Sequence, residues 1–118
     1  MLLDAEAKPL VASTGNTSSA VSSGGRHRMP VIDLFAGAGG LGIGATDAGC
    51  EVRACVELDP VACRTLRANE SYHGAVLEAD VAAITGLDLR EAARLSPGDP
   101  LIVVGGAPCQ PFSNAAYW

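Results

Sequence analysis

The chain has 118 residues, 48% of them hydrophobic, a mean hydropathy of +0.25 and a formal net charge of −5. This length suits one domain at most, and the apolar content is high enough for a core, so the composition excludes a wholly disordered chain. From Met29 onward, five Arg against eleven acidic residues leave a charge of −6. This net negative charge argues against a surface that binds nucleic-acid phosphates by itself.

Residues 1–28 are predicted to be a flexible, low-complexity leader. The stretch from Ser13 to Arg28 is rich in Ser, Gly and Thr and cannot bury enough apolar surface to offset its ordering entropy. No apolar run approaches the roughly 20 residues of a membrane span. No secretory leader accompanies the four cysteines. We therefore expect a cytoplasmic protein with no membrane contact.

Short apolar runs alternate with helical segments from Pro30 onward. Strands are predicted at about 31–35, 51–56, 75–79 and 101–104, and helices at 41–48, 61–69 and 87–95. Pro60 suits a first helical turn, and Asp59 before it suits a helix cap. The alternation predicts an α/β fold with a parallel sheet, in which the carboxyl ends of the strands share one edge where ligands bind.

The first predicted strand leads into Gly37-Ala38-Gly39-Gly40-Leu41-Gly42, which fits the pattern G-x-G-x-x-G. Glycines let the backbone turn tightly and let a ligand approach closely. Glu57 follows 20 positions after the first glycine, where a carboxylate can accept hydrogen bonds from both hydroxyls of a ribose. Asp80 ends the third strand and could accept from an adenine amino group, with Val81 covering the ring. These features indicate a ligand that contains adenosine, either a nicotinamide dinucleotide or a methionine-derived cofactor.

The fourth predicted strand leads into a turn that holds a single cysteine. In Gly105-Gly106-Ala107-Pro108-Cys109-Gln110-Pro111-Phe112-Ser113, two glycines and two prolines fix the backbone around Cys109. Such a turn exposes the sulfur at the ligand edge of the sheet. The other cysteines, Cys50, Cys55 and Cys63, suit the ordinary role of small buried hydrophobic residues.

Two segments resemble the first and fourth signature motifs of the DNA (cytosine-5) methyltransferases. They are Asp33-Leu34-Phe35-Ala36-Gly37-Ala38-Gly39-Gly40 and Gly106-Ala107-Pro108-Cys109-Gln110-Pro111-Phe112-Ser113. Glu57 and Asp80 match the intervening cofactor motifs in order. The resemblance implies that residues 29–118 form the amino-terminal part of the catalytic domain, with a partial, Rossmann-like fold of the kind that uses S-adenosylmethionine.

The resemblance also implies a reaction: transfer of a methyl group from S-adenosylmethionine to carbon 5 of cytosine in double-stranded DNA, as in DNA methylation and restriction-modification. Cys109 would add to carbon 6 as the nucleophile, because carbon 5 alone is too weak a nucleophile to take a methyl group from a sulfonium. The base would be flipped out of the duplex to reach the thiol. No metal takes part.

By the same resemblance, Phe35 would pack against the adenine, and the glycine turn would hold the methionine part. The implied cofactor-binding residues are Phe35, Ala36, Gly37, Gly39, Gly40, Glu57, Leu58, Asp80 and Val81. Pro108 would help to hold the cysteine and the flipped base, and Gln110 and Ser113 would belong to the loop that closes over that base.

One departure from the family pattern bears on activity. The Glu-Asn-Val segment, whose Glu protonates the cytosine ring, does not occur between Cys109 and Trp118. The Arg-rich motif and the target-recognition region of the family are also missing. We therefore expect a fragment or one half of a split enzyme, inactive alone, with a complementary carboxy-terminal polypeptide as partner.

Three alternatives stay open. The first is a transfer RNA substrate instead of DNA, since a related branch of the family shares these motifs. The second is a nicotinamide dinucleotide-binding Rossmann domain, although this leaves Pro108-Cys109-Gln110-Pro111 without a role. The third is an inactive remnant of a methyltransferase.

Overall fold

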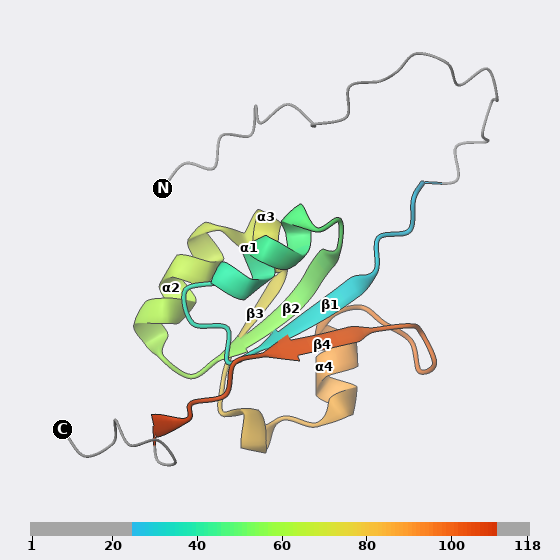
Figure 1. Cartoon of the computed structure of the whole chain (residues 1–118). Helices are drawn as coiled ribbons and strands as arrows, with labels where there is room; N and C mark the ends of the chain where they lie inside the picture. The colour runs from blue at the N-terminus through green and yellow to red at the C-terminus, as the bar shows by residue number, and fades with distance from the viewer. Residues whose placement is uncertain (1–24, 111–118) are drawn as a thin grey trace.

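The computed structural model describes residues 25–110 and forms a four-stranded sheet with helices on both faces (Figure 1). The strands are β1 (Pro30–Leu34), β2 (Glu51–Glu57), β3 (Ala75–Glu78) and β4 (Ile102–Gly105). The helices are α1 (Gly40–Asp47), α2 (Pro60–Ala68), α3 (Glu70–His73) and α4 (Gly86–Ala92), with a short 3-10 helix, η1 (Val81–Ala83). Most of the predicted leader, residues 1–24, lies outside the described residues.

The sheet has the strand order β3-β2-β1-β4, and each neighbouring pair is parallel. The predicted α/β fold with a parallel sheet is therefore confirmed. Because all four strands run in one direction, their carboxyl ends meet at a single edge, and the segments that follow them gather there (Figure 1). β1 continues into the glycine turn, β2 into the turn before α2, β3 into η1, and β4 into the segment that carries Cys109.

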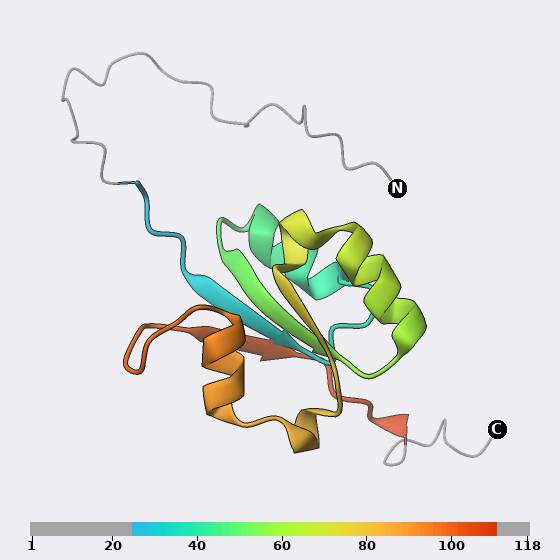
Figure 2. The same cartoon turned by 180° about the vertical axis from the view of Figure 1, so that it is seen from behind.

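The core has two layers because alternate residues of a strand point to opposite faces of the sheet. Helices α1, α2 and α3 cover one face, and α4 covers the other, as the reverse view shows (Figure 2). On the α4 face, Ile32 and Ala54 pack with Ala93 and Leu95. On the opposite face, buried residues Ala36, Cys55 and Leu66 pack together. The sheet is thus buried on both sides at β1 and β2, which lie in its centre.

Helix α2 begins as the sequence predicts. The Asp59 carboxylate accepts a hydrogen bond from the backbone N–H of Val61 at 3.0 Å, and Pro60 occupies the first turn. The cap satisfies one of the free N–H groups at the start of the helix. This fixes the direction in which the chain leaves β2.

The predicted helix at 87–95 is shorter in the structure, where α4 ends at Ala92. Arg94 follows with a φ of 55°, in the left-handed region that ends helices. Leu95 is buried in the core nevertheless, so its apolar character reflects packing and not a longer helix. The sequence analysis also missed α3 and η1, which are too short to show a helical period.

Two polar side chains, Asp33 on β1 and His73 on α3, are fully buried. Within the described residues, neither has a hydrogen-bond partner. Burial raises the pKa of Asp33 to about 6, an effect that the Gly42 N–H partly opposes and the charge of Glu57 increases. Burial lowers the pKa of His73. The core therefore contains a carboxylate that is ionised at neutral pH at a cost in free energy.

We expect Asp33→Asn to be more stable than the wild-type chain at pH 7. The native state holds the Asp33 proton more tightly than the unfolded chain, so this residue favours folding below about pH 4 and loses that contribution as the pH rises through about 6. A pKa raised by about two units corresponds to at most about 3 kcal/mol. Urea unfolding should give the variant a larger free energy of unfolding than the wild type at pH 7 and an equal one near pH 4. A variant that is less stable at pH 7 contradicts this prediction.

Candidate functional site

A cavity of about 530 Å³ lies at the carboxyl edge of the sheet. This volume is within the range of roughly 300–1,000 Å³ that small-molecule sites occupy. The lining comes from the segments that follow all four strands and is formed by Phe35, Val56, Glu57, Leu58, Asp59, Pro60, Ala79, Asp80, Val81, Gly106 and Pro108. The cavity therefore joins an apolar lining to carboxylates from two strand ends.

Six of the predicted site residues line this cavity: Phe35, Glu57, Leu58, Asp80, Val81 and Pro108. Ala36, Gly37, Gly39 and Gly40 belong to the adjoining glycine turn and are not part of the lining. Cys109 and Gln110 come directly after Pro108 and are exposed. Ser113 lies outside the described residues. The structure thus brings most of the predicted residues to one edge of the sheet, while their roles stay predictions.

The glycine turn joins β1 to α1 through a sharply bent backbone. Phe35, Gly37 and Gly39 have φ angles of 56°, 57° and 99°, in the left-handed region that favours glycine. For a bulky residue such as Phe35 this conformation is strained, and strain of this kind is concentrated at functional sites. At Gly39, a Cβ atom would also collide with the His73 ring. The turn requires glycine at position 39 for both conformation and space.

Glu57 ties the end of β2 to the glycine turn. Its Oε2 accepts the Gly37 N–H at 2.7 Å, and its Oε1 accepts the N–H groups of Leu58 and Asp59 at 2.8 and 2.9 Å. The bond from Asp59 contributes most to lowering the pKa of Glu57, and the other two lower it further. A carboxylate offers about four acceptor positions. Glu57 is therefore ionised at neutral pH and keeps a free position on Oε2.

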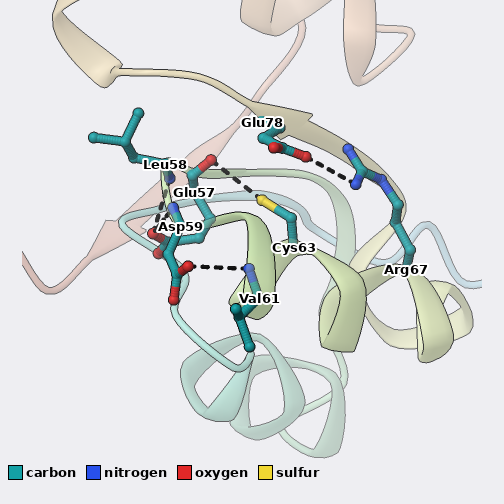
Figure 3. A network of polar contacts seen from close by, with 7 residues as sticks. All are labelled: Glu57, Leu58, Asp59, Val61, Cys63, Arg67 and Glu78. Atoms are coloured by element: carbon teal, nitrogen blue, oxygen red, sulfur yellow. Dashed lines mark hydrogen bonds and ion pairs between the residues drawn. The ribbon is translucent and has the colours of Figure 1, made fainter.

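The backbone at the end of β2 is held by a group that sequence reasoning assigned only to packing. The buried Cys63 thiol donates a hydrogen bond to the Glu57 carbonyl oxygen at 3.3 Å, as Figure 3 shows. The same oxygen accepts the Ala79 N–H at 3.0 Å, which connects β2 to the start of the Asp80 turn. Burial raises the pKa of the Cys63 thiol, which keeps its proton. No local sequence signal marks this contact, because it depends on how α2 packs on β2.

Asp80 combines a structural contact with access to the cavity. Its Oδ1 accepts the Ala82 N–H at 2.9 Å and caps η1. The carboxylate is exposed, so Oδ2 can still accept a hydrogen bond from a ligand. Val81, half-buried, lines the cavity beside it. The ordinary role of a turn residue and the predicted role at an adenine are compatible here.

Cys109 is exposed, whereas Cys55 and Cys63 are buried. The segment before it passes close to β1, since a Cβ atom on Gly105 would lie 2.9 Å from the Leu34 carbonyl oxygen. Glycine at position 105 lets β4 pair with β1 up to its end. The sulfur therefore lies on the segment that leaves the sheet at the cavity edge and is not enclosed in the core.

Other features of the described residues do not compete with this site. A second hollow of about 590 Å³ lies at the amino ends of β2 and β3, between residues such as Arg53, Glu70 and Arg94, and contains none of the predicted site residues. Within residues 25–110, no cluster of three or more His, Cys, Asp or Glu could hold a metal ion. In the same range, no helix has the length and apolar character needed to cross a membrane.

Comparison with known proteins gives consistent matches. A family described as C-5 cytosine-specific DNA methylase matches residues 29–117. The Type II methyltransferase M.SacI of Streptomyces achromogenes is 39% identical over 104 residues, covering 78% of this chain and 26% of that protein. The Type II methyltransferase M.AquIA of Picosynechococcus is 45% identical over 85 residues, covering 72% of this chain and 34% of that protein.

A crystal structure assigned as a DNA modification methyltransferase encoded within a prophage in E. coli aligns with a TM-score of 0.58 and 33% identity, covering 75% of this chain and 25% of that one. The chain thus spans about a quarter to a third of the length of these relatives. Its fold is part of the Rossmann-like methyltransferase fold, as predicted. The matched residues include both the glycine turn and the Cys109 segment. The chain belongs to the C-5 cytosine-specific DNA methylase family.

Proposed function

We propose that this chain is the amino-terminal part of a DNA (cytosine-5) methyltransferase, which binds S-adenosylmethionine in the carboxyl-edge cavity and presents Cys109 to cytosine. One observation carries the proposal: the cavity joins Phe35, Glu57 and Asp80 to Pro108, the residue before the exposed cysteine. A nicotinamide dinucleotide site has no use for a cysteine at this position. The geometry therefore favours a methyl donor that binds next to a nucleophile.

The residues of the cavity fit S-adenosylmethionine, which supplies a methyl group on a sulfonium when bound. Glu57 keeps a free acceptor position on Oε2 for a ribose hydroxyl. Phe35 and Val81 offer apolar surface to an adenine ring, and Asp80 offers Oδ2 to its amino group. The glycine turn leaves the backbone of residues 37–40 free of bulky side chains for the methionine part.

Cys109 supplies the covalent step. Its thiolate adds to carbon 6 of the base, which forms a carbon–sulfur bond and shifts the ring electrons toward carbon 5. Carbon 5 would then take the methyl group from the sulfonium of a bound S-adenosylmethionine, which would leave as a neutral thioether. Loss of the carbon-5 proton restores the ring double bond and expels the Cys109 thiolate, so the nucleophile is regenerated.

DNA binding requires positive charge that residues 29–118 do not provide, since they carry −6. We propose that a complementary carboxy-terminal polypeptide provides this charge together with the acid that protonates the ring. Without that acid, ring activation falls by about 10²- to 10⁴-fold. The chain alone is then expected to bind the cofactor in the cytoplasm without methylating DNA.

A thermal-shift titration tests the cofactor assignment. S-adenosylhomocysteine at 100 times its Kd should stabilise the folded chain by about 2.7 kcal/mol, because it binds only the native state. NAD serves as the matched ligand, since it contains the same adenosine. Stabilisation by NAD and not by S-adenosylhomocysteine would overturn the proposal in favour of a dinucleotide-binding domain.

A further inference from the structure

The proposed function makes no use of Asp33 and His73, which are both fully buried. Neither side chain has a hydrogen-bond partner among residues 25–110. A buried polar group without a partner costs free energy, and such groups are rare in native cores. Because both of these unpartnered groups lie beside the glycine turn, their placement suggests a role in the cofactor site.

Both side chains border the start of α1. A Cβ atom on Gly42 would lie 2.9 Å from His73 Nδ1 and 3.4 Å from Asp33 Oδ2. A Cβ atom on Gly39 would collide with the same imidazole ring. The ring of His73 therefore fills the space that side chains at positions 39 and 42 would need. The glycine turn and the first turn of α1 rest directly on the ring.

The charge of Asp33 is linked to the same helix turn. The Gly42 N–H lowers the pKa of Asp33, against the larger effect of burial, although the two groups do not meet the geometry of a hydrogen bond. This backbone group therefore attracts the ionised carboxylate electrostatically. His73 stays neutral, because burial lowers its pKa.

The other titratable or charged groups on the elements around this pair are few, and most lie on β2 and α2. They are Glu51, Arg53, Cys55 and Glu57 on β2, Cys63, Arg64 and Arg67 on α2, Glu70 and Tyr72 on α3, and Glu78 on β3. Helix α1 adds only Asp47 at its far end, and β4 adds none. Of these, Glu57 adds to the larger effect of burial in raising the pKa of Asp33, and Asp33 adds to the larger effect of burial in raising the pKa of the Cys55 thiol.

We propose that Asp33 and His73 are positioning residues that together shape the glycine turn for the methionine end of S-adenosylmethionine, a role that rests on the proposed function. His73 supports Gly39 and Gly42 from the interior. Ionised Asp33 attracts the Gly42 N–H electrostatically and so favours the position of the first turn of α1. Neither residue touches the ligand, because both are enclosed. Uptake of a proton by Asp33 weakens its hold on the helix, so ligand binding weakens in mild acid.

Calorimetric titration of the full chain with S-adenosylhomocysteine at pH 7 and pH 5 tests the proposal. The ligand's carboxylate and amino group keep their charges over this interval. We expect affinity to fall about tenfold from pH 7 to pH 5, because the ionised fraction of a group with a pKa near 6 falls about tenfold. Asp33→Asn should bind with the same affinity at both pH values. Asp47→Asn, an exposed charge removal on α1, should keep the wild-type difference.

His73→Phe provides a second measurement, since it keeps the volume of the ring and removes its nitrogens. An apolar ring desolvates Asp33 more strongly, so the midpoint of the binding profile should move to higher pH. A midpoint that does not move, or a pH dependence that persists in Asp33→Asn, overturns the positioning role and leaves the proposed function standing. A wild-type chain that binds no S-adenosylhomocysteine at pH 7 overturns the proposed function, and the positioning role with it.

Discussion

Replacing Cys109 with serine is expected to abolish methyl transfer and covalent capture of cytosine, while cofactor binding is unchanged. A serine hydroxyl is a much weaker nucleophile than a thiol, which is a few per cent ionised near pH 7. Loss of a covalent nucleophile lowers rates by about 10⁴-fold or more in enzymes where it has been measured. Cys109 is exposed next to the cavity and outside its lining, so the cavity itself should keep its shape.

A chimera makes this test possible, because the proposal assigns the acid and the DNA contacts to another polypeptide. Residues 29–118 replace the matching segment of M.SacI, a relative at 39% identity. Transfer of labelled methyl groups to DNA measures turnover. A duplex with 5-fluorocytosine measures capture, because fluorine cannot leave as the carbon-5 proton does. Cys50→Ser, at a half-buried cysteine away from the cavity, is the control. Methyl transfer by the Cys109→Ser chimera would refute the nucleophile assignment.

The order of the strands and of the longer helices followed from the sequence because the signals are local. Apolar runs predicted the strands, Asp59 and Pro60 predicted the start of α2, and glycines predicted the turn after β1. The error at the end of α4 has a physical cause, since Leu95 is buried by tertiary packing beyond the helix. A pattern of apolar residues predicts which side chains are buried, but it does not predict the backbone conformation that places them in the core.

The site was predictable in its residue types and not in its contacts. The spacing of Gly37 and Glu57 suggested one ligand for both, and the structure shows that they also bond to each other. His73 beneath Gly39 had no signal in the sequence, because α3 is only four residues long and reaches the turn through tertiary packing. Contacts between distant segments depend on the sheet order, which local patterns do not specify.

The bond between Gly37 and Glu57 leads to the second large effect: Glu57→Gln should weaken binding of S-adenosylhomocysteine by about 10²-fold. The substitution keeps the size of the side chain but replaces one acceptor oxygen with an amide donor, which cannot face an N–H group. It weakens the contact to Gly37 and the proposed bond to a ribose hydroxyl. Hydrogen bonds to charged groups contribute about 1.5–3 kcal/mol each, and 1.4 kcal/mol corresponds to a tenfold change in affinity.

The same substitution should also change how the stability of the chain depends on pH in acid. The pKa of Glu57 is lowered in the folded chain, so its contribution to stability is present above about pH 4.5 and is lost as the pH falls through the lowered value. Glu57→Gln lacks this step. Glu51→Gln is the matched control, because Glu51 lies at the opposite end of β2 and its side chain forms, among residues 25–110, only an ion pair with Arg53 near the surface. Calorimetry at pH 7 should separate the two variants. Equal affinities would mean that Glu57 shapes the turn without receiving the ligand, and the cavity would then need another acceptor for the ribose.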